Sequence, residues 1–309
     1  MTATLEKTSK TSKTSTMTAS RARKRFGQHF LEPAWVDKVI RAIDPKPDET
    51  FIEIGPGRGA LTRPLAARAQ RVIVYEIDRD LAAELRGNAP SNVTVVEGDF
   101  LDTINEQRLA TNDQRLVTND QRLTTNDQRL KTNDQIRVAG NLPYNVASPI
   151  MFKLVEVASS GVPLVDATLM LQREVADRLI ARPGRKEYGV LSVLIQHSAD
   201  VERLLTLPPG AFRPQPKVQS ALVRLRFHPA EPPVADAGLF ERLVQAVFTR
   251  RRKTLANALL ALPRAAQVTP ATALRIADVD GRRRPETLTV AEFVRLADAL
   301  SSVRLSAEP

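Results

Sequence analysis

The sequence predicts an α/β fold, in which helices cover both faces of a parallel sheet, followed by a small all-α C-terminal domain. Three observations lead to this prediction. Short apolar segments alternate with amphipathic segments between residues 33 and 181. A glycine-rich turn directly follows the first apolar segment, as at the ligand-binding edge of such sheets. Beyond about Pro229 only helical apolar spacing remains.

The first element is a helix near Glu32, because Pro33 suits a first helical turn and apolar residues then recur at helical spacing: Trp35, Val36, Val39, Ile40 and Ile43. Strands and helices then alternate. Short apolar strands between helices are typical of a parallel sheet buried on both faces. The predicted strands are 51–54, 71–75, 93–96, 137–139 and 167–171, and the predicted helices are 59–69, 79–86, 147–158 and 172–181.

Two segments break this pattern. Residues 1–20 repeat Lys-Thr-Ser and hold almost nothing to bury, which predicts a disordered tail, and Met17 is an alternative start. Thr-Asn-Asp-Gln recurs every 7 residues up to Gln135, with one Leu per repeat, which is too narrow a stripe for a coiled coil. We interpret 103–135 as a heptad-repeat insert in a surface loop, where extra length costs little entropy.

The C-terminal part begins after a linker, Glu231-Pro-Pro-Val234. Helical apolar spacing follows over 238–262 and 287–300. These features predict a first domain over 21–229, a small helical domain over 230–302 and a tail over 303–309.

Composition excludes several classes of protein. The 309 residues include no cysteine, which rules out disulfides, a thiol nucleophile and a cysteine-based zinc site. A reducing compartment, the cytoplasm, is the simplest location, and no metal site is predicted. No apolar run reaches the roughly 18 residues of a membrane span, so no membrane association is expected.

The net charge of +10 favours an anionic partner, because Lys and Arg that neutralise phosphates gain affinity by releasing counterions. A basic protein kept soluble by surface charge is the alternative. Clustering of the cations favours a phosphate-binding surface. The clusters are Arg23, Lys24 and Arg25; Arg250, Arg251, Arg252 and Lys253; and Arg282, Arg283 and Arg284.

The strand at 51–54 runs into Gly55-Pro-Gly57-Arg-Gly59, where glycine lets the backbone turn sharply and approach a ligand. From Glu53 the pattern is E-x-G-x-G-x-G, whereas dinucleotide-binding loops read G-x-G-x-x-G. This spacing is typical of Rossmann-like class I methyltransferase sheets, which bind S-adenosylmethionine. For such a loop taken alone, a purely structural turn is the alternative.

Acidic residues follow the next two strands. Glu76 can accept hydrogen bonds from both hydroxyls of a ribose, and Asp99 can accept from an adenine amino group while Phe100 lies against the ring. Each acid alone fits an ordinary loop carboxylate, and Asp78 is interpreted as a helix N-cap. Together with the glycine loop, they predict a cofactor site for S-adenosylmethionine.

Asn141-Leu142-Pro143-Tyr144 follows the fourth strand. The exocyclic amine of adenine is a poor nucleophile, because its lone pair is delocalised into the ring. The Asn141 side-chain oxygen and the Leu142 carbonyl could accept its hydrogens and favour a pyramidal nitrogen. Pro143 would fix the turn, and Tyr144 would stack on a flipped base. A proline turn with a surface tyrosine is the structural alternative.

These motifs resemble those of the KsgA/RsmA family of bacterial small-subunit (16S) rRNA adenine N6,N6-dimethyltransferases, across about residues 21–302. The motifs that carry the resemblance are Arg23–Leu31, Glu53–Gly57, Asn141–Asn145, Leu171–Glu174, Tyr188–Ser192, Pro208–Val218 and Arg251–Thr254. The resemblance implies that Tyr144 and Phe212 sandwich the target adenine. It implies cofactor contacts from His29, Leu31, Gly55, Glu76, Asp99 and Asn141, and Gly57 belongs to the same loop. The family usually has Asn where His29 stands.

The resemblance also implies a reaction: dimethylation of two adjacent adenines in the 3′-terminal hairpin loop of 16S rRNA, within the immature small ribosomal subunit. We expect a monomer. Three alternatives are a large-subunit rRNA methyltransferase of the macrolide-resistance type, a DNA adenine methyltransferase and a non-catalytic assembly factor. The Arg251–Thr254 and Pro208–Val218 motifs favour the small-subunit class. DNA enzymes generally carry two prolines at the catalytic turn, and the intact Asn141–Tyr144 motif argues against lost activity.

Overall fold

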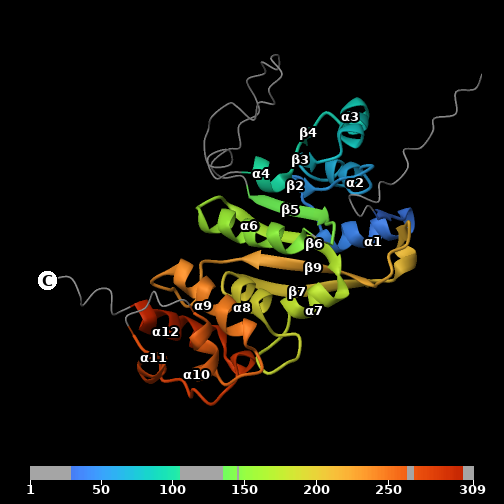
Figure 1. Ribbon diagram of the computed structural model, residues 1–309. Coiled ribbons are helices and arrows are strands. Elements are labelled where there is room, and N and C mark those ends of the chain that lie inside the picture. Colours follow the sequence, from blue (N-terminus) through green and yellow to red (C-terminus); the bar gives the residue numbers. More distant parts are fainter. Residues whose placement is uncertain (1–28, 105–134, 145, 263–267, 302–309) are drawn as a thin grey trace, which may run out of the picture.

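The computed structural model describes residues 29–104, 135–144, 146–262 and 268–301 (Figure 1). Within them, seven strands form one sheet in the order β4-β3-β2-β5-β6-β9-β7. The strands are β2 (Thr50–Ile54), β3 (Arg71–Glu76), β4 (Val93–Glu97), β5 (Ile136–Asn141), β6 (Leu164–Gln172), β7 (Ala199–Leu207) and β9 (Ser220–Phe227). The predicted parallel arrangement is confirmed for β2 to β6. The sequence analysis did not predict β9 and β7. Strand β9 pairs antiparallel with both β6 and β7.

Helices join the strands and pack on the sheet. They are α1 (Pro33–Ile43), α2 (Thr62–Ala66), α3 (Arg79–Asn88), α4 (Phe100–Thr103), α6 (Ala147–Ser159), α7 (Arg173–Leu179) and α8 (Val190–Gln196). Pro33 begins α1 as predicted, and the Asp78 side chain caps α3 by accepting from two backbone amides. The helix predicted over 59–69 is shorter, because Gly59 closes a turn with Pro56 and has a φ of +77°.

Alternate residues of the central strands face opposite layers, which is why the sheet is buried on both sides. Ile52 and Ile54 of β2 belong to a hydrophobic cluster with Met151 and Leu154 of α6. Phe51, which precedes Ile52 and faces the opposite layer, belongs to a second cluster with residues of α1 and α2. The two-sided coverage predicted from the sequence is therefore confirmed.

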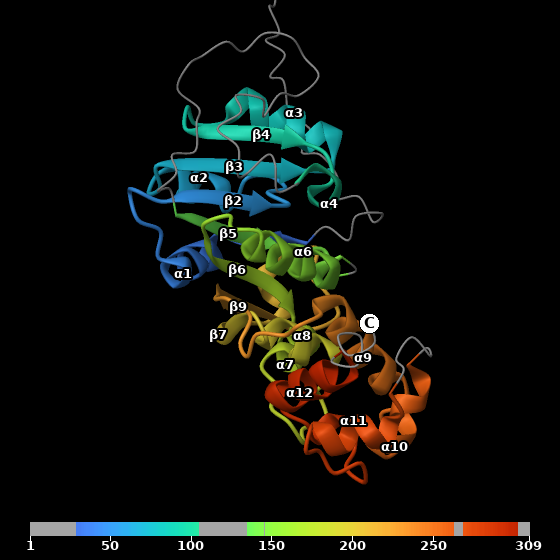
Figure 2. The same ribbon diagram turned by 90° about the vertical axis from the view of Figure 1, so that its left-hand side faces the viewer.

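The C-terminal helices gather beyond β7, at the end of the molecule opposite β4 (Figure 2). They are α9 (Ala237–Thr249), α10 (Leu255–Ala258), α11 (Pro270–Ile276) and α12 (Val290–Ser301), with 3-10 turns at Leu259–Ala261 and Pro285–Thr287. Their core also takes in Tyr188 and Val193, so they pack on residues that precede the predicted linker. The domain boundary itself stays a prediction. None of the helices described here is long and apolar enough to cross a membrane.

Some predictions fall outside the described residues. These are the tails, residues 105–134 of the repeat insert, and Arg23, Lys24 and Arg25. Thr103 ends helix α4 and Ile104 is buried in the core, and the bounds of the insert stay a prediction. The helical spacing over 238–262 corresponds to α9 and α10, which are separated after Thr249 by the basic residues.

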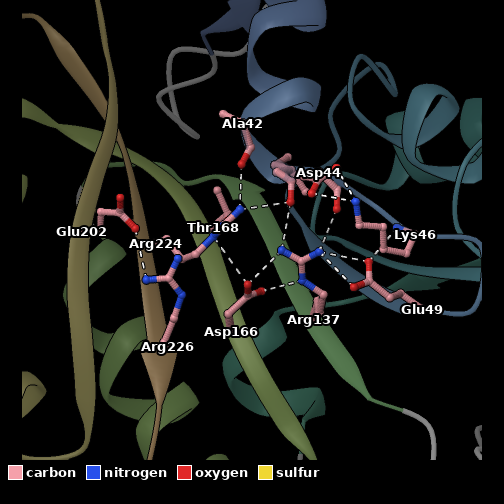
Figure 3. A network of polar contacts seen from close by, with 11 residues as sticks. Ala42, Asp44, Lys46, Glu49, Arg137, Asp166, Thr168, Glu202, Arg224 and Arg226 are labelled. Carbon is pink, nitrogen blue, oxygen red and sulfur yellow. Dashed lines mark hydrogen bonds and ion pairs between the residues drawn. The ribbon is translucent and has the colours of Figure 1, made fainter.

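Arg137, on β5, is the centre of a buried ion network at the amino edge of the sheet (Figure 3). Its Nε and Nη2 donate to the two carboxylate oxygens of Asp166 at 2.9 and 2.8 Å, and its Nη1 pairs with Glu49 at 2.9 Å. Burial opposes the charge, but the bonds to Asp166 and Glu49 outweigh it and hold the pKa of Arg137 above its ordinary value. Each charged side chain of the network therefore has a partner of opposite charge.

The same network fixes the end of α1. Arg137 Nη2 donates to the Ile43 carbonyl at 2.9 Å, and Arg224 Nη2 of β9 donates to the carbonyls of Ala42 and Ile43 at 2.6 and 3.0 Å. Carbonyls at a helix C-terminus lack intrahelical partners, so the two arginines satisfy them. Because α1 directly follows β1 (Phe30–Leu31), the network also helps to place the segment that covers the functional site.

Candidate active site

A pocket opens at the carboxyl edge of the sheet, where β2, β3 and β5 end. After β2 the chain forms α2 on one face of the sheet, and after β5 it forms α6 on the other face. Open α/β sheets bind ligands at such a point. The pocket is lined by His29, Phe30, Leu31, Glu53, Gly55, Pro56, Gly57, Ala60, Leu61, Glu76, Ile77, Asn141, Leu142, Pro143 and Tyr144. Most of the predicted cofactor and catalytic residues are therefore brought together.

The glycine loop is held by Glu76. The Gly57 amide donates to Glu76 Oε2 and the Asp78 amide donates to Glu76 Oε1, both at 2.9 Å. Gly57 has a φ of +57°, and a Cβ there would lie 3.1 Å from the Phe30 ring, so a larger residue would strain the backbone and press on that ring. Burial raises the pKa of Glu76, and the two amide hydrogen bonds oppose that rise. Each carboxylate oxygen can still accept a further hydrogen bond from a ligand.

A short strand pair covers the pocket. β1 pairs antiparallel with β8 (Phe212–Arg213), so that Phe30 lies opposite Arg213 and Leu31 opposite Phe212. The His29 carbonyl accepts from Asn141 Nδ2 at 2.7 Å, and His29 Nδ1 lies 2.7 Å from the Pro214 carbonyl. Hydrogen bonds thus connect the covering segment to the Asn141–Tyr144 turn and to the loop after β8.

The Asn141–Tyr144 turn leaves the end of β5 beside this cover. The Asn141 amide nitrogen is committed to His29, which leaves its Oδ1 as an oriented acceptor. The Tyr144 hydroxyl bonds to Ser220 Oγ at 3.0 Å, and burial raises the pKa of Tyr144, so its phenol stays neutral. The rings of His29 and Tyr144 are stacked, with centroids 5.8 Å apart. Together these residues form an aromatic wall next to one fixed hydrogen-bond acceptor.

Three predicted residues are not brought into the pocket. Phe212 is 1% exposed and packs in a core cluster with Leu31 of β1, outside the pocket lining. Phe100 is also buried and packs edge-on against Tyr75 rather than facing a ligand. The Asp99 side chain caps α4 by accepting from the Leu101 amide at 2.9 Å. The roles predicted for these three residues therefore stay predictions.

The residues that line the pocket but were not predicted as site residues include Glu53, Phe30 and Ile77. Glu53 was used only as the first letter of the loop pattern, although its carboxyl group faces the same space as Glu76. Phe30 packs under the Arg58 guanidinium, which lies 4.6 Å from the ring centre. Ile77 is 49% exposed beside Glu76, and the sequence shows only that a large apolar residue directly follows the predicted ligand acid.

The basic residues of the C-terminal part fall into two groups. Thr249, Arg250, Arg251, Arg252, Lys253, Asn257 and Leu260 line a hollow of about 510 Å³. Arg282 and Arg284 are exposed, but Arg283 turns inward and pairs with Glu292 at 2.5 Å. Arg282 also pairs with Asp280, at 3.2 Å, and the interpretation of 282–284 as a phosphate-binding cluster stays a prediction.

The pocket has the features that S-adenosylmethionine would need. A buried carboxylate, Glu76, faces it beside a glycine loop in which a side chain would be strained, and an apolar residue, Ile77, adjoins the acid. Two carboxylates and no Lys or Arg are among the lining residues, which suits a ligand with net positive charge. The fold and this site together define a Rossmann-like class I methyltransferase.

Comparison with known proteins shows to which family of methyltransferases the chain belongs. The family of ribosomal RNA adenine dimethylases matches residues 19–301, and the chain belongs to that family. It is 42% identical over 289 residues to the ribosomal RNA small subunit methyltransferase A of Aromatoleum aromaticum, covering 93% of this chain and 97% of that protein. It is 41% identical to the protein of the same name from Pseudomonas fluorescens, covering 91% and 94%.

Solved structures agree with this assignment. A dimethyladenosine transferase from Plasmodium falciparum is 25% identical and superposes with a TM-score of 0.65, covering 87% of this chain and 96% of that one. The 23S rRNA methyltransferase ErmE is 26% identical with a TM-score of 0.54, covering 88% and 99%. The predicted family and fold class are confirmed.

Proposed function

We propose that this protein uses S-adenosylmethionine to dimethylate N6 of two adjacent adenines in the 3′-terminal hairpin loop of 16S rRNA. Its substrate would be the immature small ribosomal subunit in the cytoplasm, and it would act as a monomer. The support is family membership, together with relatives at 41–42% identity that are named small subunit methyltransferase A. Because those relatives act on the small subunit by name, we favour this substrate over the large-subunit alternative.

The observation that carries the proposal is the position of Asn141. Its Nδ2 is held by the His29 carbonyl, which fixes the rotation of the amide and directs Oδ1 as an acceptor. S-adenosylmethionine would supply an electrophilic methyl group at this site. Asn141 Oδ1 and the Leu142 carbonyl would hold the hydrogens of the adenine amine, while Tyr144 stacks on the flipped base. No general base is needed, because the nitrogen loses its proton after it becomes cationic.

The test of this function is methyl transfer from labelled S-adenosylmethionine to purified ribosomal particles. Immature small subunits should accept close to four methyl groups each, because two adenines each take two. Mature small subunits and large subunits should accept almost none. Labelling of large subunits alone would instead indicate the large-subunit class of methyltransferase. Binding of particles without any labelling would indicate an assembly factor.

Glu76→Ala should weaken S-adenosylmethionine binding at least tenfold. Losing a hydrogen bond to a charged group costs about 1.5–3 kcal/mol, and the Gly57 and Asp78 amides would also lose their acceptor. Calorimetric titration of the purified protein measures the affinity. Glu97→Ala is the matched control, because Glu97 lies beside Glu76 in register but is paired with Arg79 and Arg86. Unchanged affinity in Glu76→Ala would remove Glu76 from the cofactor site.

Neutralising Arg250, Arg252 and Lys253 with glutamine should flatten the salt dependence of rRNA binding. Each lost phosphate contact reduces the slope of log affinity against log salt by roughly 0.7–0.9. Filter binding over a range of potassium chloride concentrations gives the slope. Arg283→Gln is the control and should leave the slope unchanged, because Glu292 already neutralises that guanidinium. If neutralising Arg250, Arg252 and Lys253 leaves the slope unchanged, the hollow is an ordinary solvated surface.

A further inference from the structure

Glu53 is a buried carboxylate that makes no ion pair with any of the described residues. It is 2% exposed, and in the sheet it lies between Val74 of β3 and Ala139 of β5, both apolar. By contrast, Asp166 and Glu49 are each paired with Arg137. An ionised carboxylate without a counter-charge is expensive to bury, so Glu53 requires an explanation.

The charged groups around Glu53 do not neutralise it. Thr62 of α2 donates a hydrogen bond from Oγ1 to Glu53 Oε2 at 2.6 Å, which is a neutral contact. Glu76 of β3 lines the same pocket and carries a like charge. The His29 imidazole, in the segment that covers the pocket, is hydrogen-bonded to the Pro214 carbonyl. The Arg58 guanidinium, in the glycine loop, lies over the Phe30 ring. The lining residues described here therefore hold an acid pair and neither Lys nor Arg.

We propose that Glu53 holds a proton while the pocket is empty and releases it to solvent when the cationic methionine part of S-adenosylmethionine enters. The inference rests on the proposed cofactor. In the empty pocket, burial raises the pKa of Glu53 to about 8; the Thr62 hydroxyl opposes this rise and Glu76 adds to it. A positive ligand would stabilise the carboxylate, so the proton leaves and the ligand gains a counter-charge. Glu53 thus becomes a determinant of cofactor affinity.

The direct readout is the number of protons released on binding. At about pH 7, a group with a pKa of about 8 is protonated in roughly nine molecules of ten. Calorimetric titration with S-adenosylmethionine in buffers of different ionisation enthalpy should therefore show release approaching one proton per cofactor. Affinity should rise close to tenfold per pH unit between about pH 6 and pH 7, because binding releases a proton.

Glu53→Gln imitates the protonated side chain in shape and should fold. It should still bind S-adenosylmethionine but release no proton attributable to Glu53, and its affinity should be nearly independent of pH in this range. The α-amino group of the cofactor also titrates near pH 8, but equally in both proteins, so their difference isolates Glu53. The uncharged probe 5′-methylthioadenosine should bind the wild-type protein without proton release.

A second variant tests the hydrogen bond. Thr62→Val removes the donor to Glu53 at almost constant volume, so the pH at which proton release falls to half should move upward. Equal proton release by the wild type and Glu53→Gln would overturn the inference, as would binding by the wild type without release. Failure of S-adenosylmethionine to bind at all is a different result, because it would overturn the proposed cofactor instead.

Discussion

Asn141→Ala should slow methyl transfer roughly 10²-fold or more while the fold and the affinity for rRNA stay intact. Removal of one oriented polar group in an active site has effects of this size when the group acts mainly in the transition state. Binding of the cofactor and of rRNA depends on many other contacts. Because Asn141 also holds the His29 carbonyl, the substitution loosens the covering segment as well as removing the acceptor.

The measurement is single-turnover methylation of small subunits that lack the modification, with both reactants saturating. Saturation separates turnover from binding. Asn92→Ala is the matched control, because Asn92 Nδ2 also donates to a backbone carbonyl, that of Ala66 at 2.8 Å, away from the pocket. It should lower stability but leave the rate of the folded protein unchanged. A folded Asn141→Ala protein that methylates at the original rate would disprove the catalytic assignment.

Arg137→Met should lower the free energy of unfolding by about 3–5 kcal/mol. Removing one partner of a buried ion pair leaves the other charge uncompensated, and that is more costly than the pair is stabilising. Here Glu49 would lose its partner, and Asp166 would keep only Arg224, at 3.5 Å. Two carbonyls at the C-terminal end of α1 would also lose donors.

Arg226→Met provides the comparison, because Arg226 pairs with Glu202 in the same part of the sheet but at the surface (Figure 3). The side chains of Arg226 and Glu202 are both more than half exposed, so loss of this pair should change stability by about 0–1 kcal/mol. Urea unfolding of the two variants gives midpoint and slope. Similar losses in both would mean that the Arg137 network does not behave as a buried one.

Much of the fold could be predicted because its signals are local. Pro33 and the apolar spacing after it define α1, and Asp78 caps α3, without reference to distant residues. The antiparallel strands β7 and β9 were missed although 220–227 alternates between apolar and polar residues beyond Leu222. Their pairing joins segments far apart in the chain, and nothing within either segment indicates its partner or direction.

The sequence indicates which side chains lie at strand ends, but it does not show how the remaining predicted residues pack. Glu76 and Asn141 reach the pocket because each ends a parallel strand, and such ends meet at one edge. Phe212 looked like a stacking residue, but pairing with Leu31 buries its ring. Arg283 looked like its neighbours, yet only the contact with Glu292 distinguishes it. These differences arise from tertiary contacts that a run of residues does not reveal.

The β1–β8 pair has a consequence for the order of events during synthesis. Phe30 leaves the ribosome early, but its partner Arg213 follows only after about two-thirds of the 309 residues have been joined. Strands β2 to β6 are complete before that point, whereas the cover over the pocket is not. A ligand stabilises only the states that bind it. The proposed cofactor would therefore assist the folding of nascent chains only once they extend beyond Arg213.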